Sequence, residues 1–263
     1  MSPKQPALPT IDTPYMIDFL TKLLNTPSPT GFTSQAIALV EKELAAFAEI
    51  RTEWTQKGSL LAFLPGQDRS EAPATRGLTA HVDTLGGMVR GIKPSGRLEL
   101  TNIGGFAWGS IEGENCLVHT REKGTVRGCL LPNKASVHVY DNVRDDKRDS
   151  ASMEVRLDAR VSNPEEVRQL GIEVGDFVSF DPRVEVIDGF VKSRHLDDKA
   201  AVATLVAAIK ALHDNDLKPR ESTCFLFSNY EEVGLGGSSD FPQALKELVA
   251  VDMAAIGNGQ TSD

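Results

Sequence analysis

Apolar residues recur at helical spacing in four parts of the chain. Near the start, Thr13 and Pro14 provide a capping residue and a proline in the first turn, which is how many helices begin. Residues 200–213 are a run of Ala, Val, Leu and Ile almost free of helix breakers. The pattern predicts helices over residues 13–24, 34–47, 200–213 and 241–248.

Extended segments separate these helices. A hairpin is predicted from residues 50–54 and 59–64, which flank Lys57-Gly58. Buried strands are predicted over residues 76–82 and 222–227, and another strand is predicted to end at residues 250–252. From 88 to 193, glycines and prolines separate short alternating segments, which predicts a small β-barrel or sandwich. Its strands are predicted over residues 97–102, 115–120, 125–131, 136–140, 153–159 and 177–181. We therefore expect an all-β insert within an α/β chain.

Composition narrows the class of protein. The 263 residues are 40% hydrophobic and 25% charged, as in ordinary globular proteins, and the net charge of −9 argues against nucleic-acid or membrane partners. Three widely spaced cysteines are typical of a reducing compartment. The N-terminus lacks the apolar core of a signal peptide, and no apolar run is long enough to span a bilayer. We expect a cytoplasmic protein.

A histidine and several carboxylates follow apolar strand segments at four places in the chain. In open α/β sheets, ligand sites gather at the carboxyl ends of the strands. Imidazole and carboxylate ligands together suit zinc, cobalt or manganese, and a pair of such ions can activate water for attack on a carbonyl. The residues are His81, Asp83, Asp197, Glu231, Glu232 and Asp252.

Each of these residues has a simpler explanation when taken alone. Asp197 could cap the helix that follows it, His81 could be structural, and Glu231 and Glu232 could be a solvated pair. However, Asp83 lies two residues after His81, so on a strand it shares the same face and can orient the imidazole. Glu231 and Glu232 should point apart, which lets one bind a metal while the other acts as a base. Taken together, the set favours a metal centre.

Several segments resemble the tetrahedral, or glutamyl, aminopeptidases, which are cytoplasmic dimetal exopeptidases sometimes labelled endoglucanases. The resemblance covers nearly the whole chain and rests on residues 80–83, 196–199, 231–237 and 251–252, with the Pro-Ser-Pro-Thr-Gly-Phe turn at 27–32. It implies an α/β fold, namely a mixed-sheet metallopeptidase catalytic domain with an inserted all-β, barrel-like domain. The expected boundaries are 1–87 and 194–263 for the catalytic domain and 88–193 for the insert.

The resemblance also implies two divalent ions, zinc or cobalt, in a complete subunit. His81 and Asp252 would bind the first ion, Asp197 would bridge both, and Glu232 would bind the second. The implied activity is hydrolysis of the N-terminal peptide bond of short peptides that have a free N-terminus. The insert would serve a homo-oligomer built from dimers, up to a dodecamer.

Two further roles follow from the same resemblance. Glu231 would be the general base that takes a proton from the attacking water, and Asp83 would orient the ring of His81 without binding the metal itself. Asp197 is preferred to Asp198 as the bridging residue because it stands two residues before Lys199, as the bridging aspartate does before a basic residue in related enzymes.

The chain departs from the family pattern at its end, since the family has a further histidine ligand beyond the point where this sequence stops. We therefore expect a C-terminally truncated chain, or a replacement ligand among His119, His138, His195 and His213. Two alternatives stay open. One is an inactive or single-metal homologue that acts as a metal-binding or assembly subunit. The other, more distant, is a glycosidase, although adjacent Glu231 and Glu232 do not suit two carboxyls placed across a sugar.

Overall fold

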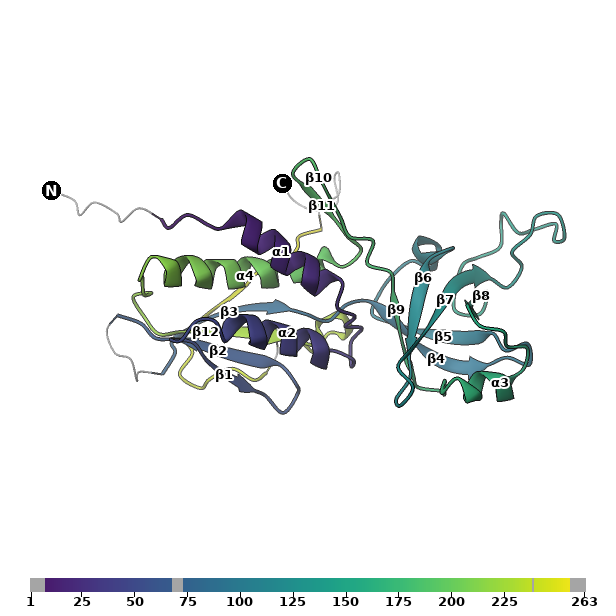
Figure 1. Ribbon diagram of the computed structural model, residues 1–263, viewed down its shortest axis with the longest axis horizontal. Helices are drawn as coiled ribbons and strands as arrows, with labels where there is room; N and C mark the ends of the chain where they lie inside the picture. The colour runs from purple at the N-terminus through teal and green to yellow at the C-terminus, as the bar shows by residue number, and fades with distance from the viewer. Residues whose placement is uncertain (1–7, 68–72, 238, 256–263) are drawn as a thin grey trace.

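A computed structural model describes residues 8–67, 73–237 and 239–255. The fold is mixed α/β, with a five-stranded sheet and its helices in one part of the molecule and a closed six-stranded barrel in the other (Figure 1). The strands of the barrel lie between the third and the twelfth strand of the chain, both of which belong to the five-stranded sheet.

The five-stranded sheet has the order β1-β2-β12-β3-β13. β1 and β2 form an antiparallel hairpin, β12 runs antiparallel to β2, and β3 is parallel to both β12 and β13. Because β3, β12 and β13 are parallel, their carboxyl ends lie at the same edge of the sheet. The strands are β1 (Arg51–Trp54), β2 (Leu60–Leu64), β3 (Arg76–His81), β12 (Thr223–Ser228) and β13 (Glu247–Ala250).

Three helices share one hydrophobic core with this sheet: α1 (Thr13–Leu24), α2 (Ser34–Leu44) and α4 (Leu196–Asp214). Alternate residues of the strands, such as Leu60 and Ala62 of β2, face that core, as the period of two requires. The predicted bounds of α1 are confirmed, but its cap is Asp12, whose carboxylate accepts the N–H of Tyr15 at 3.1 Å.

The barrel closes in the order β4-β5-β8-β7-β6-β9, with antiparallel neighbours throughout. Its interior is filled by alternate apolar residues such as Leu98, Val118 and Val155. The strands are β4 (Gly86–Ile92), β5 (Leu98–Ile103), β6 (Asn115–His119), β7 (Thr125–Pro132), β8 (Met153–Leu157) and β9 (Phe177–Phe180). The short elements are η1 (Trp108–Ile111), α3 (Pro164–Gln169), and the hairpin of β10 (Glu185–Ile187) and β11 (Phe190–Lys192).

The structure corrects two of the predicted elements. Residues 136–140 form turns, with the N–H groups of Val139 and Tyr140 donating to the carbonyl of Ser136. Residues 241–248 are not a helix, because residues 247–250 pair with β3 as strand β13. Strands β4, β10 and β11 were not predicted. In the part of the chain that is described, no helix has the length and apolar character needed to cross a membrane.

Candidate metal centre

The predicted site residues converge at the sheet edge where the parallel strands end. β3 ends at His81, which pairs with Ser228 at the end of β12, and the 3-10 turn η2 (Glu231–Val233) follows. β13 ends two residues before Asp252. The first turn of α4 lies beside them, and its backbone leaves helical dihedral angles at Asp197 and Asp198. Four separate segments of the sequence therefore meet at one place.

His81 is at the middle of this group and is only 2% exposed. Its Nδ1 lies 3.0 Å from the carbonyl oxygen of Asp83 and 3.3 Å from the carboxylate oxygen Oδ1 of the same residue. Its Nε2 lies 3.1 Å from Oδ1 of Asp197 and 3.6 Å from Oε2 of Glu231. Asp83 thus fixes Nδ1, while Nε2 faces the carboxylates of Asp197 and Glu231. This is the arrangement of a metal-binding histidine, in which one ring nitrogen is oriented by a neighbour and the other is directed at the ion.

The structure holds one compact group of possible metal ligands in its described part, which consists of His81, Asp198 and Asp252. The ligand atoms of these three residues all lie within 4.8 Å of one another. Asp198 is 2% exposed, and its Oδ2 accepts the backbone N–H of His81 at 3.0 Å. The first turn of α4 therefore brings two aspartates to His81, one toward its ring and one toward its backbone.

Asp83 organises the other side of the group. It is fully buried, and its two carboxylate oxygens accept the backbone N–H groups of Glu231 and Glu232, each at 3.2 Å. Burial would raise the pKa of Asp83, but its bonds to His81 and Thr30 hold that pKa below its ordinary value. An ionised Asp83 therefore fixes the turn that presents the two glutamates.

The acids around His81 repel one another. Burial and then the charge of Asp197 raise the pKa of Glu232 to about 7, and burial raises the pKa of Asp198 to about 7, with a contribution from Asp252. Burial also raises the pKa of Glu231. A crowded group of carboxylates around one oriented imidazole fits a divalent cation such as zinc or cobalt, because the cation relieves the repulsion and accepts both ligand types.

The other histidines lie apart from this group. The Nε2 of His119 contacts Oγ of Ser179 at 2.8 Å in the barrel, and the Nδ1 of His213 contacts Glu49 at the far end of α4. His138 is exposed on the turn after β7, and His195 is buried at the start of α4. In the structure as described, the compact ligand set of His81, Asp198 and Asp252 includes none of them.

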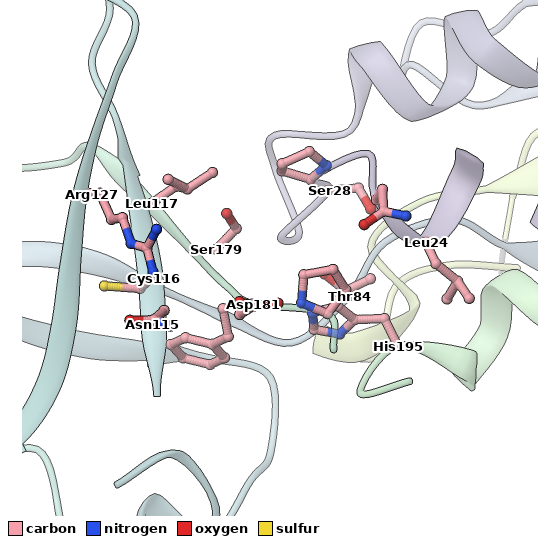
Figure 2. Close-up of a pocket in the computed structure, with 14 residues that line it drawn as sticks. Leu24, Ser28, Thr84, Asn115, Cys116, Leu117, Arg127, Ser179, Asp181 and His195 are labelled. Atoms are coloured by element: carbon pink, nitrogen blue, oxygen red, sulfur yellow. The ribbon is translucent and has the colours of Figure 1, made fainter. Parts of the chain in front are cut away.

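A cavity of about 240 Å³ lies where the barrel meets the helical part of the molecule. Figure 2 shows Leu24, Ser28, Thr84 and His195 on one side of it and residues of the barrel, such as Leu117, on the other. None of the proposed metal ligands lines this cavity. It therefore lies outside the candidate centre, although Thr84 directly follows Asp83 in the sequence.

Two residues that the sequence did not single out contact the centre. Thr30 donates its hydroxyl to Asp83, and Gly104 packs against Glu232. Gly104 follows β5 at a φ of +75°, and a Cβ there would lie 2.5 Å from Leu85 and 3.3 Å from the carbonyl oxygen of Glu232. The Gly104-Gly105 pair in the sequence could have suggested a turn, but not the contact.

Replacing Gly104 by alanine is expected to displace Glu232 and to weaken zinc binding and catalysis, the latter by up to about 10²-fold, because small misplacements at a reactive site have large effects. Gly113 is the matched control. Its φ of +78° imposes the same backbone strain on an alanine, but a Cβ there meets nothing within 4 Å. Zinc affinity measured by competition with a chelator should separate the two variants, and equal affinities would contradict the contact's role.

Comparison with protein families adds the decisive observation, because the model of the M42 glutamyl aminopeptidases matches residues 58–263. The chain belongs to the M42 glutamyl aminopeptidase family. A curated relative, "Putative aminopeptidase YhfE" of Bacillus subtilis (strain 168), is 47% identical over 248 residues, which is 94% of this chain and 70% of the relative.

Two solved structures share the fold of this chain. The TET1 peptidase of Pyrococcus horikoshii, which can assemble into a tetrahedron or a large octahedral shell, matches with a TM-score of 0.76 and 25% identity over 94% of this chain and 72% of that one. A TET aminopeptidase from the archaeon Thaumarchaeota archaeon SCGC AB-539-E09 matches in fold, with a TM-score of 0.74 and 23% identity. That match covers 85% of this chain and 60% of the other. M42 membership supports a peptidase and does not favour a glycosidase.

Proposed function

We propose that this chain carries most of the centre of a metal-dependent aminopeptidase, which hydrolyses the N-terminal peptide bond of short peptides with a free N-terminus. The observation that carries the proposal is the convergence of His81 with carboxylates from α4, η2 and the end of β13. The chain spans 70% of YhfE and 60–72% of the two TET structures, so the activity of the whole protein is part of the proposal.

The proposed ligands are His81 and Asp252 for one ion, Asp197 as a bridge, and Glu232 for a second, with zinc or cobalt as the metal. Asp197 is favoured as the bridge because the Oδ2 of Asp198 is already engaged by the backbone N–H of His81. When bound, the ions would polarise the scissile carbonyl and lower the pKa of the attacking water.

Glu231 is the proposed general base. Its backbone N–H is bound by Asp83, and its Oε2 lies 3.6 Å from Nε2 of His81, so the Glu231 carboxylate faces the centre. Glu231 is not, however, among the three residues whose ligand atoms lie within 4.8 Å of one another. It takes the proton of the attacking water and returns it to the leaving amine. Its raised pKa brings the carboxyl closer to the pH at which such a transfer is efficient.

The domain organisation belongs to the same proposal. Residues 1–87 and 194–263 contribute to the catalytic domain, and residues 88–193, which contain most of the barrel, form an inserted domain used for assembly. The assembly of the related TET1 peptidase into closed shells supports a homo-oligomer built from dimers, with a dodecamer as its larger form.

The proposal is tested by metal content and by hydrolysis of a matched pair of peptides. After reconstitution with zinc or cobalt, elemental analysis is expected to give two ions per complete subunit. Leucyl-alanyl-alanine is expected to lose its N-terminal residue, while the same peptide with an acetylated N-terminus stays intact. Cleavage of both peptides would contradict an aminopeptidase. One tightly held ion and no hydrolysis would instead favour the metal-binding or assembly subunit.

A further inference from the structure

We propose that Thr30 is a positioning residue for the metal centre: its hydroxyl sets the carboxylate of Asp83, and through it the ring of His81 and the Glu231–Glu232 turn. The inference rests on the proposed function and assigns a role in it to a residue of the turn between α1 and α2. Thr30 is 6% exposed, and its Oγ1 donates to Oδ2 of Asp83 at 2.6 Å.

The contacts of Asp83 show why one hydroxyl matters. Its Oδ1 faces Nδ1 of His81 at 3.3 Å and accepts the N–H of Glu231 at 3.2 Å. Its Oδ2 accepts the N–H of Glu232 at 3.2 Å and the hydroxyl of Thr30 at 2.6 Å. The Thr30 bond is the shortest of the four. Without the Thr30 bond, Oδ2 accepts only the long bond from the N–H of Glu232. The carboxylate can then rotate away from the position in which it contacts both the ring of His81 and the backbone of the Glu231–Glu232 turn.

Thr30 can fix Asp83 because it is itself fixed. Its backbone N–H donates to the carbonyl of Thr84 at 3.2 Å, and the N–H of Thr84 donates to the carbonyl of Ser28 at 2.9 Å. The hydroxyl of Ser28 donates to the carbonyl of Val82 at 2.7 Å. The turn therefore binds the chain on both sides of Asp83, at Val82 and at Thr84.

Two other parts of the molecule hold the turn in place. The ammonium group of Lys199, fully buried in the first turns of α4, donates to the carbonyl of Thr26 at 2.7 Å. Phe32 packs against His119 of the barrel, with ring centroids 4.5 Å apart. The turn thus contacts both the helical part of the molecule and the barrel. The hydroxyl of Thr30 connects this turn to Asp83 of the metal centre.

The variants that test this role are Thr30→Val, which keeps the shape of the side chain but removes the hydroxyl, and Thr30→Ser, which keeps the hydroxyl. Thr33→Val is the matched control. Thr33 lies in the same turn and is 5% exposed, but its hydroxyl accepts a long 3.4 Å bond from Asn229 and does not contact Asp83. All three variants are compared with the unmodified protein in zinc affinity, by chelator competition, and in kcat/KM.

Thr30→Val is expected to bind zinc about 10–100-fold more weakly, the usual effect of removing a partner that orients a ligand. Thr30→Ser is expected to restore the affinity, and Thr33→Val to leave it unchanged. Wild-type affinity in Thr30→Val, or an equal loss in Thr30→Val and Thr30→Ser, would overturn the proposal. Hydrolysis by the unmodified protein tests the aminopeptidase separately, since zinc affinity can be compared even if no peptide is cleaved.

A second readout needs no metal. In the imidazole nitrogen NMR spectrum of the metal-free protein, the chain's five histidines can be compared between variants. Thr30→Val is expected to move the two ring-nitrogen resonances of His81 and to leave the other histidines in place, whereas Thr33→Val moves neither. Unchanged His81 resonances in a folded Thr30→Val protein would show that the hydroxyl does not orient the ring.

Discussion

Replacing Glu231 by glutamine is expected to lower kcat/KM for an unblocked peptide by about 10²–10⁴-fold, the typical contribution of a general base, while the metal content stays unchanged. Glutamine keeps the size of the side chain and its backbone bond to Asp83, but it cannot accept a proton from water. The measurement is kcat/KM on the metal-loaded protein, with elemental analysis of the same sample.

The matched control is Glu53→Gln on the edge strand β1. The side chain of Glu53 is 59% exposed and forms an exposed ion pair with Arg51, a type of contact that contributes little to stability. This variant is expected to keep full activity. Full activity in the Glu231 variant would refute its role as the base, and loss of metal from it would show that Glu231 is a ligand instead.

Zinc is expected to stabilise the metal-free protein strongly. At a free concentration of 100 times its Kd, a ligand that binds only the folded state adds about 2.7 kcal/mol, which for a chain of this size raises Tm by about 5–10 °C. The physical reason is the repulsion among the acids around His81. Magnesium, which prefers oxygen ligands and retains water, is expected to raise Tm much less. His81→Ala is expected to abolish most of the zinc effect.

The same shift should depend on pH. Burial raises the pKa of Glu232, a proposed ligand, and of the neighbouring Asp198 to about 7 in the metal-free protein. At pH 6, therefore, Glu232 mostly holds a proton that zinc must displace, and Asp198 adds little negative charge to the site. At pH 8 both are ionised, so zinc displaces only the proton of His81. Burial lowers the pKa of His81, but its bond to Asp83 outweighs this and raises that pKa to about 10, so the histidine proton is displaced at both pH values. The zinc-induced rise in Tm, measured by scanning calorimetry, is therefore expected to be larger at pH 8 than at pH 6. A rise that is equal at both pH values would show that these carboxylates do not take part.

The candidate site was largely predictable because its residues obey a rule of position. His81, Glu231 and Asp252 each follow an apolar strand, and parallel strands end at one edge of a sheet. Thr30 obeys no such rule. Its hydroxyl reaches Asp83 only because the turn between α1 and α2 folds onto the end of β3, a long-range contact that no spacing in the sequence reveals.

The two wrong elements fail for different physical reasons. Residues 241–248 carry apolar residues that suit a helix, but the free edge of β3 offers backbone partners to residues 247–250. At Gly77 of β3, a Cβ would lie 3.1 Å from Leu245 and from Leu248, so the glycine leaves room for both side chains. Residues 136–140 alternate like a strand, but Val137 and Val139 are exposed, and none of the strands in the described part of the chain pairs with them.

The interleaving of barrel and sheet also sets the order in which a growing chain could assemble the proposed metal centre. The ribosome completes β3 with His81 first and then the whole barrel, whereas Asp197, Glu232 and Asp252 emerge only afterwards. The barrel can close while the centre still has a single histidine and its supporting aspartate. Binding of the proposed metal would therefore be a late event that waits for β12 and β13 to join β3. A released chain that ends near residue 190 is expected to contain a folded barrel but no bound ion.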